Sequence, residues 1–514
     1  MTLCRPSRTA APRGRVALIV PRWTDRGCVE PQGTPFRSLT MVGAFLAAGF
    51  EVHFADQEVD FDRGGRLDAY VASLADCVAA FVWMNEMYPF HQSVNAQQIA
   101  ERIRAAHPSL PIVCGGEFVS VCPRGFFDFS HAFHYVLRGY GEATGVQLVE
   151  HLLAGTEPVD VEGIVFTTRA GERIDRPAAP RARYSADWLE PYRQLDMEPY
   201  VQIGGVLGND QRTLTIAAGR GCVKGCRFCA WSNHTARILD EDVYFELMVD
   251  LRDRFGVRQF HVAELDFFTW PRRALALAER LRAEAPDIVW FALGSPVDLV
   301  RLGDAECRAL HAGGLRKVEI GSESASARML RAIGKHHQPE DIHTVSRRLV
   351  AHGIRPMNNF LFGFPGETRS DRAASLAMIH RLFRLSPTMC HFTYRYYQPV
   401  WGTGSGDEAL AAVPDRATRL DRWLADRHRY HVEGERQLPW LPPEDEAEIK
   451  ELINFQLPLA TSRIPLGRAW QGGVYRLLRS RAQRAVATDR RLGRFDRWVF
   501  RRAVGRPLDQ TYIP

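Results

Sequence analysis

The sequence lacks any apolar run of the roughly 18 residues that a membrane-spanning helix needs. Its first apolar stretch, Val16–Val20, is too short for the core of a signal peptide and is typical of a buried strand. The chain shows no secretory features, which argues against disulfide bonds among its 10 cysteines. We therefore expect a cytoplasmic protein without a membrane span.

A complete set of zinc ligands is also absent. Cys222, Cys226 and Cys229 lie in GRGCVKGCRFC (residues 219–229), with C-x3-C-x2-C spacing, but no fourth Cys or His stands at ligand spacing. Structural zinc normally takes four protein ligands, and His234 follows too closely to be an obvious partner. Thiolates are soft ligands that suit iron–sulfur clusters. Three of them on one short loop can hold three irons of a cubane cluster and leave the fourth iron open.

This loop resembles the cysteine loop of the radical SAM superfamily, which has the same spacing and commonly an aromatic residue before the last cysteine, here Phe228. The resemblance implies a [4Fe-4S] cluster whose open iron chelates S-adenosylmethionine (SAM). Reductive cleavage of SAM would then give a 5′-deoxyadenosyl radical. The other cysteines have no assigned chemistry. Four lie in apolar segments and are expected in the core, and three are expected in loops: Cys77, Cys114, Cys307 and Cys390, then Cys4, Cys28 and Cys122.

The N-terminal third alternates short apolar runs with amphipathic stretches, which favours a parallel sheet with crossover helices. The expected strands are 16–20, 51–55, 79–83, 112–114 and 134–137, and the expected helices are 39–48, 95–106 and 144–153. Glycine turns follow the fourth strand (Gly115-Gly116) and the fifth (Gly139 to Gly141). Doubly wound sheets bind ligands at this edge, although such turns are also common as tight connections.

The order of these features resembles the cobalamin-binding domain that precedes the cluster domain in one class of radical SAM enzymes. The matching pieces are LTMVGAFLAAGFEV (39–52), VCGGE (113–117), VLRGYGE (136–142) and VEGIVF (161–166). The resemblance implies cobalamin contacts from Gly115, Gly116, Gly139, Gly141 and Glu142. The cobalt-ligating D-x-H-x-x-G pattern is absent after the first strand, where residues 22–27 read RWTDRG. This implies a cobalt without His ligation from that loop; a degenerate domain that binds nothing is the alternative.

The middle of the chain repeats the strand–helix alternation. The expected strands are 214–217, 259–263, 289–293, 317–320, 359–362 and 391–396. Six parallel strands make a partial barrel rather than a closed barrel of eight, and its open side can admit a large substrate or a second domain.

Polar residues at the strand ends of this barrel are the candidates for cofactor and substrate contacts. By the resemblance, Glu323 and Ser324 in GSESAS (321–326) and Gly363 and Glu367 in FGFPGET (362–368) contact SAM. Ser324 and Ser326 also suit a helix N-cap. Asp266 follows the second strand, shares a face with Glu264, and suits either SAM binding or a salt bridge with Arg272 or Arg273.

Two tyrosines on the last strand, Tyr394 and Tyr396, are catalytic candidates, because alternate side chains there would point into the barrel. They would position the substrate or relay a proton, and core packing is the equal alternative. The adjacent pair His336-His337 cannot face one way on a helix and is interpreted as surface.

The C-terminal segment contains no recognisable motif. Helices are expected over 415–427, 447–455 and 474–500. The segment from Arg463 to Arg506 contains 13 arginines and two aspartates, which gives it a local charge of +11. Because the formal net charge of the chain is +6, the rest of the chain carries −5. This pattern suits a solvated helix face, or a patch for an acidic substrate, a carrier or an electron donor such as flavodoxin or ferredoxin. Nucleic acid is not expected, because no recognised module accompanies the charge.

The sequence therefore predicts an α/β chain of several domains. They are a disordered N-terminus (1–14), a doubly wound, flavodoxin-like cobalamin-binding domain (15–165), a linker (166–205), a partial (β/α)6 radical SAM barrel (206–405) and a mainly helical basic segment (406–514). The resemblance implies methyl transfer to an unactivated carbon, or to phosphorus, of a small-molecule or peptide substrate. The same cofactors used for cyclisation or rearrangement, and a non-catalytic cobalamin sensor, are the alternatives. The motifs concern cofactors and do not name the substrate.

Overall fold

The computed structural model describes most of the chain, and every structural statement below concerns that part. The described residues are 2–6, 11–22, 34–61, 66–84, 91–116, 119–120, 131–178, 184–203, 211–232, 234–400, 402–412, 438–461 and 469–503. The predicted helix over 415–427 and most of the segment 22–27 lie outside them.

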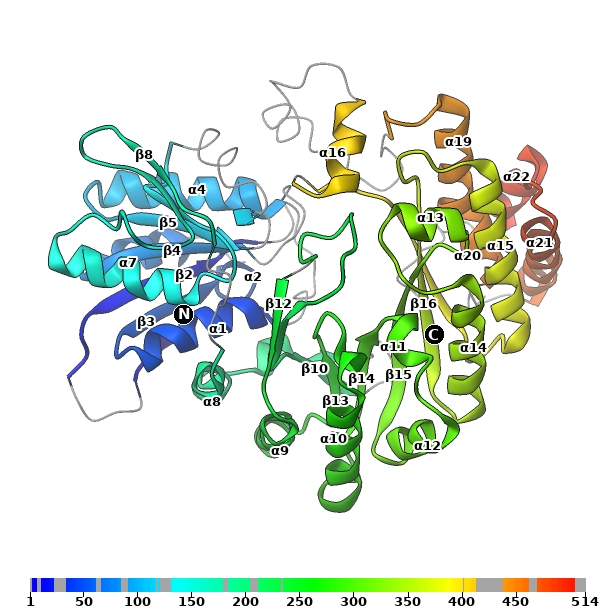
Figure 1. Cartoon of the computed structure of the whole chain (residues 1–514), viewed down its shortest axis with the longest axis horizontal. Coiled ribbons are helices and arrows are strands. Elements are labelled where there is room, and N and C mark those ends of the chain that lie inside the picture. The colour runs from blue at the N-terminus through cyan, green and yellow to red at the C-terminus, as the bar shows by residue number, and fades with distance from the viewer. Residues whose placement is uncertain are drawn as a thin grey trace.

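The N-terminal domain is built on an eight-stranded sheet in the order β1-β3-β2-β4-β5-β6-β7-β8 (Figure 1). The strands are β1 Thr2–Cys4, β2 Arg15–Val20, β3 Glu51–Asp56, β4 Cys77–Met84, β5 Ile112–Gly116, β6 Tyr135–Leu137, β7 Ile164–Thr167 and β8 Arg173–Asp175. The run β3-β2-β4-β5-β6 is parallel, and β1, β7 and β8 add to it antiparallel. The parallel part has the predicted doubly wound order.

Both faces of this sheet are buried, as continuous apolar strands require. Val16 and Leu18 of β2 pack with helices α1 (Phe36–Ala47) and α7 (Glu142–Ala154). The alternate residues Ala17 and Ile19 pack instead with α3 (Arg66–Ala72) and α4 (His91–Ala106) on the opposite face. Alternate residues of β2 therefore pack into two different cores, one on each face of the sheet.

Two sequence predictions about the N-terminus are wrong. Thr2–Cys4 is not disordered, because it forms β1 and pairs antiparallel with Val52 to Phe54 of β3. Cys4 is fully buried rather than in a loop. The four cysteines expected in the core are buried as predicted. The sheet also extends through β8, to Asp175.

The second domain is a curled seven-stranded sheet in the order β17-β16-β15-β14-β13-β10-β9. Its strands are β9 Gln202–Ile203, β10 Arg212–Ile216, β13 Gln259–Val262, β14 Val289–Gly294, β15 Leu315–Glu323, β16 Arg355–Phe362 and β17 His391–Tyr396. All except β9 are parallel, which confirms six parallel strands. Its main helices are α9 Glu241–Phe255, α10 Pro271–Glu284, α12 Asp304–Ala312, α13 Ala327–Ala332, α14 Pro339–Ala351 and α15 Arg369–Leu385.

The two faces of the curled sheet differ in burial. Residues such as Leu214, Phe260 and Val318 are buried in one cluster with the surrounding helices. The alternate residues on the inner face are mixed in burial: His261 and Glu319 are half-buried, whereas Phe291 and Lys317 are fully buried.

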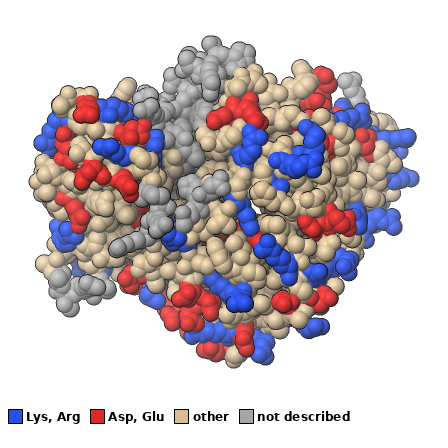
Figure 2. Space-filling view, in the orientation of Figure 1, with Lys and Arg blue, Asp and Glu red and all other residues tan. Residues whose placement is uncertain are grey.

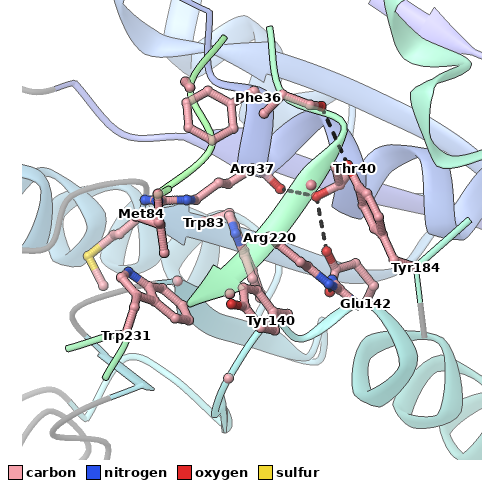
Figure 3. A pocket seen from close by; sticks show the side chains of 17 residues that line it. Phe36, Arg37, Thr40, Trp83, Met84, Tyr140, Glu142, Tyr184, Arg220 and Trp231 are labelled. Atoms are coloured by element: carbon pink, nitrogen blue, oxygen red, sulfur yellow. Dashed lines mark hydrogen bonds and ion pairs between the residues drawn. The ribbon is translucent and has the colours of Figure 1, made fainter. Parts of the chain in front are cut away.

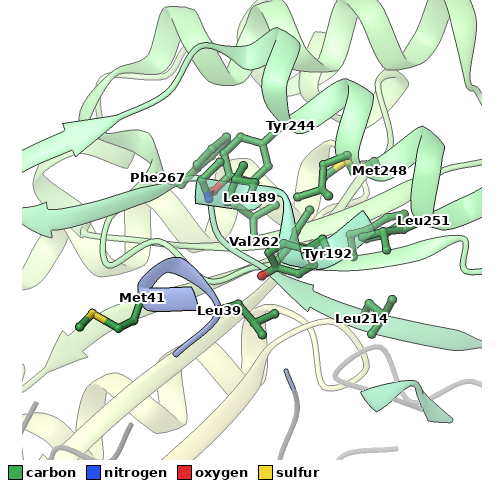
Figure 4. Packing of buried hydrophobic residues seen from close by; sticks show 14 of the residues in the cluster. Leu39, Met41, Leu189, Tyr192, Leu214, Tyr244, Met248, Leu251, Val262 and Phe267 are labelled. Carbon is green, nitrogen blue, oxygen red and sulfur yellow. Dashed lines mark hydrogen bonds between the residues drawn. The ribbon is translucent and has the colours of Figure 1, made fainter. Parts of the chain in front are cut away.

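A single hydrophobic core joins the two domains (Figure 4). Leu39 and Met41 of α1 belong to the same buried cluster as Leu189 and Tyr192 of the linker and Leu214 of β10. The linker supplies short turns of helix that fill this junction: η1 Ala186–Leu189, α8 Pro191–Gln194 and η2 Glu198–Tyr200. Gly43 is required here, because a Cβ on it would lie 2.1 Å from the Trp188 carbonyl oxygen.

The C-terminal segment packs on the far edge of the curled sheet, beside α15 (Figure 1). Its helices are α19 Pro443–Glu451, the π-helical turn Leu452–Gln456, α20 Leu457–Thr461, α21 Ala469–Ala487 and α22 Arg494–Ala503. The helix predicted over 474–500 is in fact two, because Asp489 takes a left-handed conformation (φ 48°) between them.

Part of the C-terminal positive charge is neutralised within the segment. Arg491 lies 2.5 Å from Glu448, and Arg481 pairs with Asp496 at 2.7 Å. Lys and Arg side chains are visible along the edge that α21 and α22 occupy, with acidic residues between them (Figure 2). Within the described residues, no helix is both long and apolar enough to cross a membrane.

The pair His336-His337 lies only partly on the surface. His337 is 3% exposed, and burial lowers its pKa to about 3.

Candidate active site

The cysteine loop begins in a two-stranded hairpin outside the curled sheet, formed by β11 Gly219–Cys222 and β12 His234–Ile238. Cys222, Cys226 and Cys229 are all half-exposed. The Lys224 amide donates to Cys222 Sγ at 3.5 Å, and the Cys229 amide to the Cys226 carbonyl at 3.2 Å. Burial raises the pKa of Cys229 to about 11, so a bound cation is needed to hold it as a thiolate.

The three thiols fit a cluster better than a single ion. No group of three His, Cys, Asp or Glu side chains in the described residues converges at the distances of a mononuclear site. In a cubane cluster each thiolate binds a different iron, so the sulfurs need not converge. The loop is also packed closely: a Cβ on Gly334 would lie 2.5 Å from the Gly225 carbonyl oxygen. The set of donors suits the predicted cluster and not zinc.

A buried network in the barrel anchors the start of the hairpin. Arg273 donates to both oxygens of Glu264 at 2.7 Å, and Tyr244 Oη donates to Glu264 Oε1 at 2.7 Å. The Ala218 amide in turn donates to Tyr244 Oη at 2.7 Å. A Cβ on Gly219 would lie 2.2 Å from Glu264 Oε1, so glycine is needed at this contact.

Asp266 lies beside the cysteine loop but not in the predicted salt bridge, because Arg273 is taken by Glu264. Lys224 Nζ lies 3.9 Å from Asp266 Oδ2 and forms a shorter ion pair with Asp298. Burial, and then the neighbouring Asp298 carboxylate, raise the pKa of Asp266. The carboxylate therefore remains a candidate for a polar ligand near the cluster.

The two residues predicted after β15 differ in their surroundings. Glu323 adopts φ 57°, a strained conformation for a residue with a side chain, and its carboxylate lies 3.2 Å from Lys335 Nζ. Ser324 is fully buried and its Oγ lies 3.3 Å from Ser375 Oγ. The contacts of both residues with SAM stay predictions. Ser326 caps α13 as predicted, accepting from the Met329 amide at 3.3 Å.

The segment after β16 is closed by protein groups. Glu367 accepts from the Gly363 amide at 2.6 Å, and Trp440 Nε1 donates to the Gly363 carbonyl at 2.7 Å. Burial raises the pKa of Glu367 to about 8, so the carboxyl is protonated at neutral pH. Gly363 and Glu367 thus have structural partners of their own, and a contact with SAM stays a prediction.

The glycine turns of the N-terminal domain meet an unpredicted side chain, Trp83. A Cβ on Gly115 or on Gly141 would lie 2.2 Å from the Trp83 ring. A Cβ on Gly116 would lie 1.8 Å from the Met84 carbonyl oxygen, whereas near Gly139 (φ 73°) only the Ala178 Cβ is close, at 3.2 Å. Three of the four glycines are therefore explained by packing within the domain, and Gly139 is the most open of them.

A pocket lies between the two domains (Figure 3). One wall comes from the N-terminal sheet edge and α1, and the other from the barrel and the cysteine hairpin. The lining residues are Phe36, Arg37, Thr40, Trp83, Met84, Gly116, Gly139, Tyr140, Glu142, Tyr184, Ala217, Gly219, Arg220, Gly221, Trp231, Ala263 and Leu265. This lining contains no histidine within the described residues.

Aromatic and cationic side chains join the two walls. Tyr140 stacks on Trp231 with ring centroids 4.8 Å apart and an interplanar angle of 16°. The Arg37 guanidinium lies 5.5 Å from the Trp231 ring, and burial lowers the pKa of Arg37 to about 10. Trp231 follows Cys229 by two residues, so this stack brings the cysteine loop to the turn Gly139–Gly141.

Glu142 is bound by protein groups rather than open toward a ligand. Its Oε2 lies 2.5 Å from Arg220 Nη1, and Thr40 Oγ1 donates to its Oε1 at 3.0 Å (Figure 3). The predicted cobalamin contact of Glu142 therefore competes with an ion pair between the domains.

Of the two alternatives left open for Tyr394 and Tyr396, the structure shows core packing and not an orientation into the barrel. Both are buried on the outer face of β17, in the cluster formed with the C-terminal helices. Tyr394 Oη donates to Thr461 Oγ1 of α20 at 3.1 Å. On β17 the inner face carries Thr393 and Arg395 instead, since they alternate with the buried tyrosines.

Several pocket residues were missed from the sequence, notably Arg37, Trp83, Arg220 and Trp231. Trp231 and Arg220 lie close to the cysteines along the chain, so their proximity to the cluster could have been inferred. Arg37 and Trp83 come together with them only through the packing of the two domains.

Comparison with known proteins gives the family of the barrel. The model of the Radical SAM superfamily matches residues 216–379. Three curated relatives align over more than half of this chain. An uncharacterized methyltransferase, PH0819, of Pyrococcus horikoshii is 26% identical over 296 residues (56% of this chain, 61% of that protein). The anaerobic magnesium-protoporphyrin IX monomethyl ester cyclase of Synechocystis is 24% identical (65% and 66%). The cobalamin-dependent radical SAM methyltransferase TokK of Streptomyces tokunonensis is 25% identical (63% and 49%).

The alignments thus span about half to two thirds of the length of these relatives. Among solved structures, the cobalamin-dependent SAM radical enzyme OxsB matches with a TM-score of 0.66 at 15% identity, covering 92% of this chain and 72% of that one. The radical SAM methyltransferase TsrM of Kitasatospora setae matches with a TM-score of 0.60 at 19% identity, covering 77% and 78%. The chain therefore carries a radical SAM domain, and its relatives include a cobalamin-dependent radical SAM methyltransferase.

Proposed function

We propose that this radical SAM protein is a cobalamin-dependent methyltransferase that methylates an unactivated carbon, or phosphorus, of a small-molecule or peptide substrate. The cofactors are a [4Fe-4S] cluster on Cys222, Cys226 and Cys229, SAM, and cobalamin bound at the glycine-turn edge of the N-terminal domain. The domain assignments follow: cobalamin on residues 15 to about 175, and the cluster and SAM within 206–405.

One observation carries the proposal: a single pocket has the cysteine hairpin in one wall and the carboxyl edge of a doubly wound sheet in the other. Ligands bind at that edge in open α/β sheets. A substrate in this pocket would meet both cofactor sites at once. The kinship with TokK and the fold shared with TsrM and OxsB support the same pairing.

The chain's own residues would bind the cofactors and shield the pocket from water. When bound, the cluster and SAM supply a radical that removes hydrogen from the substrate, and cobalamin supplies the methyl group. The three thiols hold the cluster, and the Lys224 amide orients Cys222. Glu323 and Asp266 lie near the loop as candidates for the polar groups of SAM. Tyr140 and Trp231 both line the pocket, and their stacked rings would shield this side of it from water.

The test uses anaerobically reconstituted protein and a converted substrate. We expect about four irons and one cobalamin per chain, without nitrogen coupling from a protein His in the cob(II)alamin spectrum. Turnover should release S-adenosylhomocysteine and 5′-deoxyadenosine in about equal amounts and move label from methyl-labelled SAM into the product. Unlabelled product would contradict methyl transfer.

Cyclisation or rearrangement without methyl transfer is the second candidate, favoured by the alignment with a cyclase over 65% of this chain. It would form 5′-deoxyadenosine without stoichiometric S-adenosylhomocysteine. Protein with full cluster and cobalamin that never cleaves SAM would point instead to a cobalamin sensor. An acidic electron donor such as flavodoxin or ferredoxin is the expected protein partner, in the cytoplasm.

A further inference from the structure

We propose that Arg220 and Glu142 are positioning residues: their buried ion pair holds the cysteine hairpin at a set distance from the cobalamin edge of the N-terminal domain. The inference rests on the proposed function for its consequence, but the pair itself is a feature of the protein without cofactors.

The pair links the segment next to the cysteine loop with the segment next to the glycine turn. Arg220 precedes Cys222 by two residues on β11. Glu142 is the first residue of α7 and directly follows the turn Gly139–Gly141. Arg220 Nη1 and Glu142 Oε2 are 2.5 Å apart, with only 9% and 3% of the two side chains exposed. A movement of either cofactor wall would therefore have to break this contact.

Aromatic rings enclose the guanidinium. Arg220 lies 4.4 Å from the ring centroid of Tyr140, 4.9 Å from that of Tyr184 and 5.2 Å from that of Trp188. Tyr140 belongs to the glycine turn, and the other two belong to the linker between the domains. Cation–π contacts of a desolvated arginine add to the ion pair. Two segments distant from the hairpin in the sequence, the glycine turn and the linker, thus meet at Arg220, and Thr40 of α1 joins them through its hydrogen bond to Glu142.

The hairpin needs this second attachment because β11 pairs only with β12 and belongs to neither large sheet. On the barrel side it is held at Ala218 and Gly219 by Tyr244 and Glu264. On the other side Arg220 attaches it to the N-terminal domain. The hairpin is clamped between both domains, so the position of Cys222 depends on both anchors.

The experiment compares Glu142→Gln with Glu150→Gln on the same helix. Glu142→Gln keeps the shape but leaves a buried cation without its counter-charge, which is strongly unfavourable. Glu150 pairs with Arg13 at 2.9 Å, but both side chains are over 40% exposed, and such surface pairs contribute little. Arg220→Lys is the second variant, because lysine keeps the charge and lacks the planar fork that suits a carboxylate and stacked rings.

Two measurements report the position of the cysteine hairpin relative to the N-terminal domain, and neither depends on activity. In holoprotein, pulsed EPR gives the distance distribution between cob(II)alamin and the reduced cluster. We expect a narrow distribution for the wild type and Glu150→Gln, and a broadened or shifted one for Glu142→Gln and Arg220→Lys, read in each protein from the molecules that hold both cofactors. In cofactor-free protein, hydrogen exchange should rise in residues 219–222 and 136–145 for the Glu142 and Arg220 variants alone.

Unchanged distance and unchanged exchange in both pair variants would overturn the positioning role. A wild type that binds no cobalamin would instead overturn the proposed function, and the exchange measurement would still decide the role of the pair. If Glu142→Gln does not fold, Arg220→Lys alone supplies both readouts.

Discussion

The two walls of the pocket between the domains differ in what their motif residues contact. Beside the barrel wall, on the loop that continues from the lining residues Gly219 to Gly221, three half-exposed cysteines make only amide contacts such as that of Lys224 with Cys222. On the N-terminal wall, the glycines expected to meet a ligand meet the protein: Gly115 and Gly141 lie against Trp83, and Gly116 against the Met84 backbone.

The difference shows what each kind of motif encodes. A cysteine triad specifies the chemistry of its ligand, because few groups other than a cluster use three thiolates in this spacing. A glycine specifies only that something comes close, and here that neighbour is an indole ring or a carbonyl oxygen. The first kind of signal identifies a cofactor, whereas the second identifies a tight approach whose partner the fold decides.

The largest effect should follow from the barrel wall. Replacing Cys222, Cys226 and Cys229 together by Ala should abolish iron binding, since these three thiols are the ligands proposed for the cluster. Cobalamin binding should persist, because the opposite wall is untouched. Iron and cobalamin are quantified by chemical assay and absorbance. Retained iron in the triple variant would refute the cluster, and joint loss of both cofactors would show that the walls are not separable.

A substitution at Glu367 tests whether this residue, which the sequence predicts to contact SAM, has a structural role. Its pKa rises from an ordinary 4.5 to about 8 in the fold, chiefly through burial. Unfolding therefore releases a proton between these values, so its stabilisation is complete below pH 4.5 and is lost as pH rises through 8. The slope for one proton reaches about 1.4 kcal/mol per pH unit. Urea titrations across this range should show a flatter profile for Glu367→Gln; parallel profiles would argue against a buried neutral carboxyl.

The glycine wall is tested by a double-mutant cycle between Gly115 and Trp83. Gly115→Ala should lower the free energy of unfolding by about 1–3 kcal/mol, the usual range for overpacking. In a Trp83→Leu background the same change should be nearly neutral, because the colliding ring is gone. Denaturant unfolding measures all four proteins. An equal loss in both backgrounds would mean that something other than Trp83 requires this glycine.

The smallest effect is expected at Tyr394, a catalytic candidate from the sequence. Tyr394→Phe removes one hydrogen bond to Thr461 and should lower stability by about 1 kcal/mol. Iron content, cobalamin content and SAM cleavage should match the wild type. A large loss of SAM cleavage in a variant that remains folded would instead support a catalytic role for Tyr394.

Much of the fold could be predicted because strand periodicity and glycine stops are local. The five parallel strands of the first domain and the six of the second are where the apolar runs placed them. Which face of β17 points inward was not readable from the strand alone, since alternation gives two faces without naming them. The C-terminal helices decide it by burying Tyr394 and Tyr396. Likewise, the GYGE turn gave no sign that Glu142 would pair with Arg220, 78 positions later in the chain.

If the protein is a methyltransferase, the methyl group of SAM must reach cobalamin at the N-terminal wall. Reduced, reconstituted protein is given methyl-labelled SAM without any substrate, and the bound cobalamin is then separated from the chain. We predict about one label per chain in the cobalamin fraction, with an equal amount of S-adenosylhomocysteine, from the transfer of one methyl group. Label that stays on SAM, in protein with full cluster and cobalamin, would contradict the methyltransferase.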